Sequence, residues 1–174
     1  MKNIRVAING FGRIGRALFR VLHEREGIVV VAINDVADIR SLAHLLKYDS
    51  VHRIFNADVK ATDDAILVNG QTIVLSHESQ IEKISWTDCD IVIEATGKFL
   101  NKSDLEKHIE AGAKKVILTS PPNGDDVKMV VLGVNDQILE ETDTIISNAS
   151  CTTNCLAPIV KVLNENFKIK KGLM

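Results

Sequence analysis

Ile8-Asn9-Gly10-Phe11-Gly12-Arg13-Ile14-Gly15 is the stretch that decides the fold of this chain. It follows an apolar run typical of a buried strand, and it opens an amphipathic segment with helical spacing. Glycines spaced as GxGxxG between a strand and a helix are the pattern of a dinucleotide-binding turn. Gly10 permits the tight turn, Gly12 lets a pyrophosphate approach the backbone, and Gly15 lets the helix pack on the strand. The N–H groups at the helix start then favour phosphate binding.

An acidic residue stands where this pattern requires one. Asp35 lies 20 residues after Gly15, at the end of the second apolar run. A carboxylate there accepts hydrogen bonds from the adenosine ribose hydroxyls and repels a 2′-phosphate, so the sequence favours NAD over NADP. The alternative is that three glycines and an acid are ordinary turn residues. Because the strand, the helix, the second strand and the acid follow one another at the spacing of the dinucleotide-binding pattern, the interpretation as ordinary turn residues is the weaker one.

Strand-like and helix-like segments alternate along the chain. Near-continuous β-branched runs, typical of parallel strands covered on both faces, fall at residues 4–8, 28–33, 91–95, 115–119, 129–134 and 144–146. Helical patterns lie between several of them, at residues 14–24, 39–48 and 103–111. The last of these begins with a Ser-Asp-Leu-Glu capping box at Ser103 and ends before Gly112. We therefore predict an α/β fold with a doubly wound, mostly parallel sheet, a Rossmann-type NAD-binding domain.

The middle of the chain breaks this alternation. Residues 58–61 and 65–75 are strand-like, and Asn69-Gly70 within them is a strong signal for a hairpin turn. We predict an antiparallel hairpin inserted in the sheet and no separate domain there. The sequence has no internal repeat, low-complexity tract or flexible linker.

Composition excludes several classes of function. The 174 residues are 45% hydrophobic and 25% charged, with a net charge of −2, which gives no electrostatic case for nucleic acid or membrane binding. No apolar stretch is long enough to span a membrane, and no signal peptide is visible. Cys89, Cys151 and Cys155 are an odd set unsuited to a disulfide framework, which indicates reduced thiols and a cytoplasmic location. No histidine or carboxylate cluster accompanies the cysteine pair, so we predict no metal site.

The segment Ser147–Cys155, Ser-Asn-Ala-Ser-Cys-Thr-Thr-Asn-Cys, joins a cysteine to a helix start. Ser150 or Asn148 suits the N-cap, and an apolar-periodic run follows, so Cys151 falls in or just before the first turn. Unpaired N–H groups and the positive end of the helix dipole favour the thiolate there, and the thiolate is the nucleophilic form. A buried structural cysteine is the alternative, and the local sequence leaves both open.

With a dinucleotide site and a candidate thiol nucleophile, the chain closely resembles the phosphorylating glyceraldehyde-3-phosphate dehydrogenase family. The SCTTNC core is highly specific, and the resemblance covers the whole chain. The matching segments are Ile8–Arg16, Leu42–Ser50, Ala95–Phe99, Ala111–Val116, Gly133–Asn135 and Ser147–Pro158. The resemblance implies an NAD-binding domain over residues 1–150 and the truncated start of a catalytic domain, its first helix, over residues 151–174.

The resemblance also assigns site residues. It implies that Arg13 and Ile14 contact the cofactor pyrophosphate through the glycine loop and that Asp35 binds the ribose. The other cofactor and substrate residues that it implies are Thr96, Gly97 and Phe99 at the cofactor border, Ser120 near the nicotinamide ribose, and Ser150 and Thr152 beside the catalytic Cys151. A strand-end turn is the alternative interpretation for Thr96 and Gly97, and core packing is the alternative for Phe99.

The implied activity is NAD-dependent oxidation of glyceraldehyde 3-phosphate with inorganic phosphate, a step of glycolysis, in a homotetramer. Cys151 would attack the aldehyde to give a thiohemiacetal, and hydride transfer would leave a thioester that phosphate cleaves. The family's base is a histidine whose position falls beyond Met174. All five histidines of this chain precede Cys151: His23, His44, His52, His77 and His108. We therefore expect the cofactor-binding half of a larger enzyme, inactive alone.

The chain departs from the family pattern on the adenine side. Ser79 stands where an arginine is common, Val51–Phe55 lacks the glycine usual after the histidine, and Pro121-Pro122 replaces Ala-Pro. Two alternatives stay open. Erythrose-4-phosphate dehydrogenase shares the nucleophile segment, and a stand-alone NAD-binding module would use Cys151 as a redox-sensitive thiol. Residues 168–174, which are strand-like, favour the enzyme.

Overall fold

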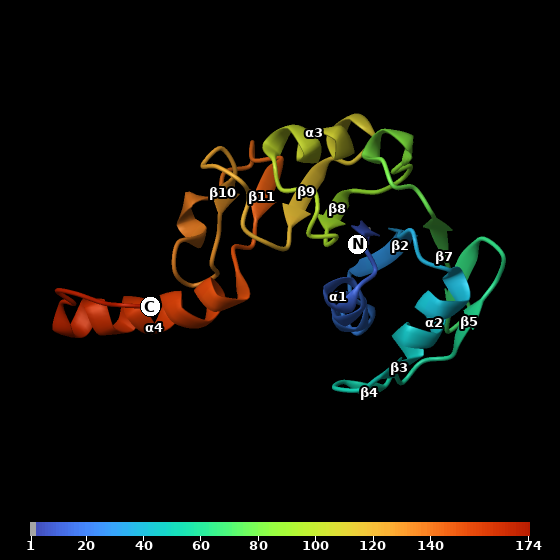
Figure 1. Ribbon diagram of the computed structural model, residues 1–174, viewed down its shortest axis with the longest axis horizontal. Helices are drawn as coiled ribbons and strands as arrows, with labels where there is room; N and C mark the ends of the chain where they lie inside the picture. The colour runs from blue at the N-terminus through green and yellow to red at the C-terminus, as the bar shows by residue number, and fades with distance from the viewer. Residues whose placement is uncertain (1–2) are drawn as a thin grey trace.

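The computed structural model describes residues 3–174, which form one large sheet covered by helices (Figure 1). The strands are β1 (Ile4–Asn9), β2 (Ile28–Asn34), β3 (Tyr48–Asp49), β4 (Arg53–Ile54), β5 (Val59–Ala61), β6 (Ala65–Val68), β7 (Gln71–Ser76), β8 (Ile91–Glu94), β9 (Lys115–Leu118), β10 (Lys128–Met129) and β11 (Ile145–Ser147). The helices are α1 (Arg13–His23), α2 (Ile39–Lys47), α3 (Lys102–Glu110) and α4 (Cys151–Phe167), with 3₁₀ turns η1 (Ile81–Lys83) and η2 (Asp136–Ile138).

The sheet has nine strands in the order β10-β11-β9-β8-β1-β2-β7-β6-β5, and β3 and β4 pair separately. From β10 to β7 every pairing is parallel. After β2 the chain returns to the other side of β1, because β8 is the second neighbour of that strand. This change of direction makes the fold doubly wound, as the sequence predicts.

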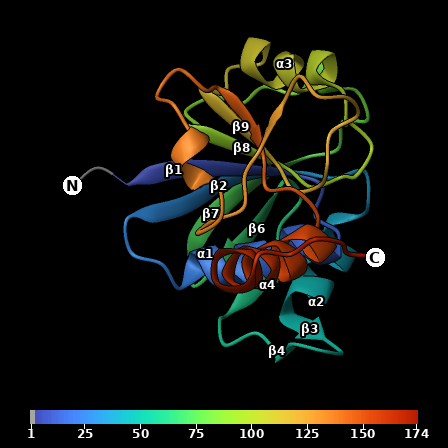
Figure 2. The same ribbon diagram turned by 90° about the vertical axis from the view of Figure 1, so that its left-hand side faces the viewer.

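Two apolar layers cover the two faces of the sheet. Val6 and Ile8 of β1 pack in a core with α1 and α2, whereas Ala7 between them packs in a second core beneath α3. Successive side chains of a strand point to opposite faces, so a strand buried on both must be apolar throughout. Figure 2 shows α3 on one side of the sheet and α1 and α2 on the other.

The predicted hairpin is confirmed as an extension of this sheet. β7 runs parallel to β2, and β6 and β5 add antiparallel strands outside it. Asn69 and Gly70 both adopt positive φ values, 50° and 81°, at the turn between β6 and β7. Positive φ at both central residues is the condition for a two-residue type I′ turn, which matches the twist of paired strands.

Helix α3 begins differently from the prediction. Its N-cap is Asn101, whose carbonyl oxygen accepts the N–H groups of Asp104 and Leu105. The Asn101 side chain also donates to the Asp104 carboxylate at 3.0 Å. Ser103 therefore lies inside the first turn, and the predicted capping box is wrong. The predicted end is right, because Gly112 follows the helix with φ +114°.

Two predicted strands are shorter or absent. The run at residues 129–134 pairs only at Lys128–Met129, since the Asn135 side chain accepts the Val131 N–H at 2.7 Å and Gly133 turns with φ +78°. Residues 168–174 form no strand. Lys168 ends α4 in the left-handed conformation, and a strand requires a neighbour with which to share its hydrogen bonds.

Helix α4 extends away from the sheet beyond β10 and β11 (Figure 1). None of its residues is buried. Its exposed apolar side chains are Leu156, Ile159, Val160, Val162, Leu163 and Phe167. Within residues 3–174, no helix combines the length and the apolar character needed to cross a membrane.

Candidate functional site

The predicted site residues follow the carboxyl ends of parallel strands. Gly10 and Asp35 come directly after β1 and β2, and Thr96 comes two residues after β8. Ser120 comes after β9, and Cys151 after β11. Because β1 lies between β2 and β8, the change in winding direction opens a crevice above its end. Ligands of open α/β sheets bind at such a crevice.

The glycine loop is shaped by two close backbone contacts. A Cβ at Gly10, where φ is +92°, would lie 2.6 Å from the Thr96 nitrogen, and a Cβ at Gly15 would lie 2.1 Å from the Gly10 oxygen. Both residues must therefore be glycine for the loop to pack. A Cβ at Gly12 would meet no atom within 4 Å. The protein itself does not need a glycine there, so the absent side chain leaves room for a ligand.

The start of α1 is suited to an anion. Gly12 is the N-cap, and no side chain caps the first turn. Arg13 and Ile14 are the first two residues of α1, so their backbone N–H groups have no acceptor within the helix and suit a phosphate. Arg16, which sequence reasoning did not single out, donates to the Phe11 carbonyl oxygen at 2.9 Å and so fastens the loop from the helix side.

A cavity of about 250 Å³ lies beside this loop and brings together five of the predicted residues. It is lined by Asn9, Gly10, Gly12, Asn34, Asp35, Val36, Glu78, Ser79, Ala95, Thr96, Lys98 and Phe99. The Asp35 carboxylate accepts the N–H of Phe11 at 2.7 Å and the N–H of Ala37 at 2.9 Å, one on each oxygen. Each oxygen keeps a further acceptor site for a ribose hydroxyl. Gly97 is exposed and does not line the cavity.

The residues around Cys151 form a second group along the same strand ends. The Ser147 hydroxyl donates to the Ser120 carbonyl oxygen at 2.7 Å, which joins the ends of β9 and β11. The Ser120 hydroxyl oxygen is buried and has no hydrogen-bond partner within the part of the chain that the structure describes. Buried polar atoms are normally paired, so this hydroxyl suits a ligand group.

The turn before Cys151 is held by side chains on both sides. Ala149 is buried with φ 56°, a conformation that L residues rarely adopt. The Ser150 side chain is the N-cap of α4 and accepts the Thr153 N–H at 2.9 Å. The Asn154 amide donates to the carbonyl oxygens of Asn148 and Ser150, at 2.7 and 2.9 Å. Cys151 is thus the first residue of α4, as the sequence predicts, and it is exposed, which the local sequence left open.

Thr152 lies next to the thiol, with its hydroxyl oxygen 4.0 Å from the Cys151 sulfur. Cys151 and Cys155 are free cysteines. Over residues 3–174, no cluster of three or more histidine, cysteine or acidic side chains is arranged to hold a metal ion. This end of the site presents a thiol at a helix start.

Sequence reasoning missed several residues of the cavity wall. Asn34, Val36 and Lys98 line it and had no assigned role. Ser79, at a position that the resemblance places on the adenine side, reaches the cavity with Glu78 on the loop after β7, because β7 pairs with β2. A buried carboxylate, Glu94, lies at the end of β8 and bonds to Thr96 and Asn9. The one sequence signal for it is an acidic residue inside the apolar run at residues 91–95.

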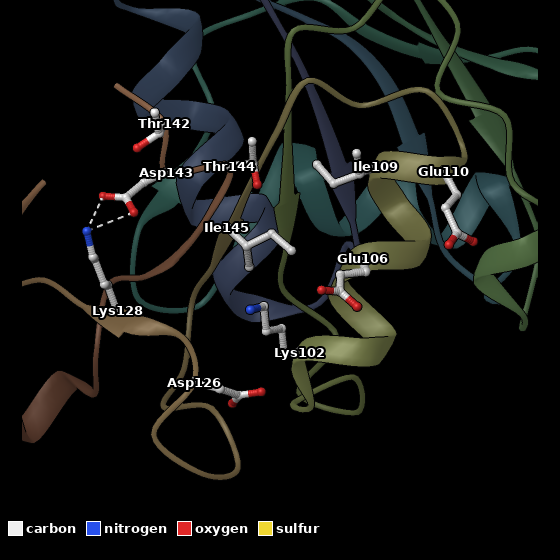
Figure 3. Close-up of a pocket in the computed structure, with 10 residues that line it drawn as sticks. All are labelled: Lys102, Glu106, Ile109, Glu110, Asp126, Lys128, Thr142, Asp143, Thr144 and Ile145. Atoms are coloured by element: carbon white, nitrogen blue, oxygen red, sulfur yellow. Dashed lines mark hydrogen bonds and ion pairs between the residues drawn. The ribbon is translucent and has the colours of Figure 1, made fainter. Parts of the chain in front are cut away.

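A surface groove of about 530 Å³ between α3 and the β11 side of the sheet contains none of the predicted residues (Figure 3). Within it Lys128 and Asp143 form an ion pair at 2.9 Å, and Lys128 also lies 3.3 Å from Glu140. The Glu140 backbone N–H and the Lys128 ammonium lower the pKa of Asp143, which in turn raises the pKa of Lys128. These pairs tie the loop that carries Asp143 to β10, and the other charged residues that line the groove are Lys102, Glu106, Glu110 and Asp126.

Fold and site together define an NAD-binding domain of the dehydrogenase type, with a thiol at a helix start along the same sheet edge. Residues 4–102 match the family model described as glyceraldehyde 3-phosphate dehydrogenase, NAD binding domain. Residues 150–174 match the model described as glyceraldehyde 3-phosphate dehydrogenase, C-terminal domain. The chain belongs to the glyceraldehyde 3-phosphate dehydrogenase family, and its cofactor is NAD.

The similarity extends over nearly the whole chain. It is 52% identical to glyceraldehyde-3-phosphate dehydrogenase of Thermotoga maritima, with 98% of this chain and 52% of the relative covered. It is 53% identical to glyceraldehyde-3-phosphate dehydrogenase 2 of Bacillus subtilis, with 98% and 51% covered. For the enzyme of Geobacillus stearothermophilus the identity is 49%, with 98% and 52% covered. The chain thus spans about half the length of these relatives.

Proposed function

We propose that this chain is the NAD-binding half of a phosphorylating glyceraldehyde-3-phosphate dehydrogenase, acting on glyceraldehyde 3-phosphate and inorganic phosphate in glycolysis. The observation that carries the proposal is the place of Cys151. It is the exposed first residue of a helix that follows β11, along the edge of the sheet where the glycine loop follows β1. A nucleophile and a cofactor loop along one edge are what aldehyde oxidation through a covalent intermediate requires.

In this proposal the cofactor residues act at three places along the cofactor. At the adenosine end, Asp35 binds the ribose, and Thr96, Gly97 and Phe99 border the cofactor. At the pyrophosphate, Gly10, Gly12 and Gly15 shape the loop, and the backbone N–H groups of Arg13 and Ile14 bind the phosphates. Ser120, whose hydroxyl lacks a partner in the described structure, approaches the nicotinamide ribose.

The thiol chemistry begins at Cys151. Its thiolate forms a C–S bond with the aldehyde carbon, and the resulting alkoxide takes up a proton to give a thiohemiacetal. NAD, when bound, would supply the acceptor for the hydride of that carbon. As the hydroxyl proton leaves, the remaining group is a thioester on Cys151, and attack by phosphate releases an acyl phosphate and restores the thiolate. Ser150 and Thr152 flank the thiol and contact the substrate.

The proton acceptor for this sequence is not assigned to any histidine of this chain. His108 is a fully buried residue of α3, and the other four histidines lie before residue 80. We propose that the base belongs to a catalytic domain that starts at residue 151, after an NAD-binding domain over residues 1–150. The chain alone is then inactive. The parent enzyme is proposed to be a cytoplasmic homotetramer.

An alternative role as a stand-alone binding module is less well supported. α4 exposes an apolar side that includes Ile159, Val162 and Phe167, and none of its residues is buried. Contiguous exposed apolar surface marks a place where another surface packs. This favours a protein whose further part covers α4. Erythrose 4-phosphate as the substrate is the second candidate within the family.

The binding part of the proposal is tested by titrating NAD and NADP against the chain in a calorimeter. We expect saturable NAD binding that Asp35→Asn weakens about tenfold, since the neutral amide replaces the charged acceptor for the ribose hydroxyls. Asp63→Asn, an exposed acid beyond β5, is the matched control and leaves the affinity unchanged. Failure of NAD to bind, or equal affinity in the Asp35 variant, would contradict the assignment.

The inactivity of the chain is tested separately. NADH production is followed at saturating NAD, glyceraldehyde 3-phosphate and phosphate. We expect none above the level of a Cys151→Ser variant. Turnover that depends on Cys151 would show that the chain contains its own base and would overturn this part of the proposal.

A further inference from the structure

A line of buried polar side chains crosses the sheet at the cavity beside the glycine loop, which we call the adenosine cavity because Asp35 lines it. Asn9, Asn34 and Glu94 end the neighbouring strands β1, β2 and β8, and His108 lies on α3 above them. All four are at most 3% exposed. Burial of a carboxylate among apolar side chains is costly unless hydrogen bonds replace the lost water. The burial of the Glu94 carboxylate is therefore not explained by hydrophobic packing.

Glu94 is satisfied entirely by donors. One carboxylate oxygen accepts the Asn9 amide and the His108 Nε2–H, the latter at 3.0 Å. The other oxygen accepts the Thr96 backbone N–H at 2.7 Å and the Thr96 hydroxyl. The Thr96 hydroxyl in turn accepts the Lys98 N–H at 3.1 Å. Glu94 thus fixes the turn that forms one wall of the cavity, although it does not line the cavity itself.

Trp86 sets the direction of these bonds from the far side. Its indole Nε1 can only donate, and it lies 2.9 Å from His108 Nδ1. Nδ1 must therefore be the unprotonated acceptor, and the proton of the neutral ring is on Nε2, pointing at Glu94. Trp86 is itself 1% exposed. Trp86, a residue of the core under α3, thereby fixes the tautomer of His108 that donates a hydrogen bond to Glu94.

Asn34 carries the network to the opposite wall. Its amide nitrogen donates to the Asn9 side-chain oxygen at 2.8 Å and to the Glu78 carbonyl oxygen at 2.9 Å. Its amide oxygen accepts the Glu78 N–H and the Ser76 hydroxyl, both at 2.8 Å. The loop after β7, which contributes Glu78 and Ser79 to the cavity, is thus tied to the same network.

We propose that Glu94 is a positioning residue for the adenosine half of the cofactor. It holds the Thr96 turn directly and the Glu78 loop through Asn9 and Asn34, so it sets the separation of the two cavity walls. It contacts no ligand. This inference rests on the proposed function, because it takes NAD to be what the walls hold. A site performs well only when residues behind it lock the contacting groups in place.

The test is Glu94→Gln, which keeps the size of the side chain and replaces one acceptor oxygen with an NH₂ donor. That donor faces either the Asn9 amide and the His108 Nε2–H or the Thr96 N–H and hydroxyl, so one wall loses its support. We expect the dissociation constants of NAD and of ADP-ribose, measured calorimetrically on folded protein, both to rise about tenfold. Glu106→Gln, an exposed glutamate on α3, is the matched control and leaves both unchanged.

A spectroscopic readout separates positioning from simple destabilisation. The chain has one tryptophan, so the indole N–H of Trp86 gives a single, unambiguous NMR signal. We expect this signal to shift when NAD binds to the unsubstituted chain, because three hydrogen bonds in series, Trp86–His108, His108–Glu94 and Glu94–Thr96, connect the indole to the cavity wall. In Glu94→Gln it should no longer respond. A role in stability alone would leave the affinity of the folded fraction and the NAD-dependent shift unchanged.

The outcomes are distinct. If the parent chain binds neither NAD nor ADP-ribose, the proposed function fails and this inference fails with it. If the unsubstituted chain binds NAD and Glu94→Gln binds it equally well, only the positioning role is overturned. Should Glu94→Gln not fold, Trp86→Phe removes the donor that orients His108 and tests the same network. It is expected to raise the NAD dissociation constant about threefold, and an unchanged value would refute the role.

Discussion

Gly10 and Gly12 stand two residues apart in one loop, yet an added methyl group would meet a different environment at each. At Gly10 it would press on the Thr96 backbone in a conformation with φ +92°, whereas at Gly12 it would enter open space. The glycine at position 10 is therefore required by the fold of the protein. The glycine at position 12 is required only when a ligand approaches the loop.

We therefore expect alanine substitutions to separate folding from binding. Gly10→Ala should lower the free energy of unfolding by about 1–3 kcal/mol, because backbone must shift and positive φ is strained. Gly12→Ala should change it by less than about 1 kcal/mol and weaken NAD binding at least about tenfold. Urea denaturation and NAD titration of both variants measure the two effects. If Gly12→Ala binds NAD as tightly as the unsubstituted chain, the pyrophosphate does not bind at this loop.

Single residues also show where sequence reasoning reaches its limit. The glycines and Asp35 are recognisable because their roles depend on spacing within one strand–helix–strand unit. Besides the nearby Thr96, the partners of Glu94 are Asn9, 85 residues away, and His108, 14 residues away. Only the pairing of β1 with β8 and the packing of α3 bring them together. No local pattern encodes such a network.

Among the helices, α4 is the one whose stability depends most on the capping of its ends. With no residue buried, it draws little stability from tertiary packing, so the bond from the Thr153 N–H to the Ser150 side chain matters more than usual. Ser150→Ala should cost about 1 kcal/mol of helix stability and reduce helical circular dichroism. It should also slow alkylation of Cys151 by iodoacetamide, because the thiol loses its place at an ordered helix start.

The comparison thiol for this prediction lies in the same helix. Cys155 is exposed like Cys151 but lies one turn further on, away from the positive end of the dipole. In the parent chain Cys151 should react faster at neutral pH. Asn166→Ala, near the opposite end of α4, is the control and should leave the rate at Cys151 unchanged. Equal rates at the two cysteines would refute the effect of the helix start.

The elements that sequence reasoning misplaced have one cause in common. Residues 129–134 have strong β propensity, but Asn135 and Gly133 turn the chain after Met129. Residues 168–174 include Ile169 and Leu173 but pair with no strand in the described structure. The runs at β1, β2, β8 and β9 were predicted well because each lies between two neighbours in the sheet. A strand is defined by its partners, which its own sequence does not contain.

At the scale of the whole molecule, Cys89 predicts how stability changes with pH. Burial raises the pKa of this thiol from 9.0 to about 11. The unfolded chain therefore releases the proton before the folded one does, and the unfolded state binds fewer protons between these values. Stability is fully present below about pH 9 and falls as the pH rises towards 11, by about 2 kcal/mol at pH 10.5.

The measurement compares urea unfolding of the parent and of Cys89→Ala at pH 8 and pH 10.5. Lysine and tyrosine titration affects both proteins alike, whereas only the parent contains the buried thiol. We expect the parent to lose about 2 kcal/mol more than the variant over this interval. Equal losses would show that the thiol contributes nothing to the alkaline unfolding of the domain.

The exposure of α4 has a consequence for cooperativity. Opening this helix exposes no core residue, so it can pass between helix and coil while both cores stay folded. The surroundings of Cys151 then follow a local equilibrium, separate from global unfolding. A surface that covers the apolar side of α4 shifts that equilibrium towards helix, and by linkage it raises the fraction of molecules whose thiol is ready to react. Docking and activation of the thiol are thereby thermodynamically coupled.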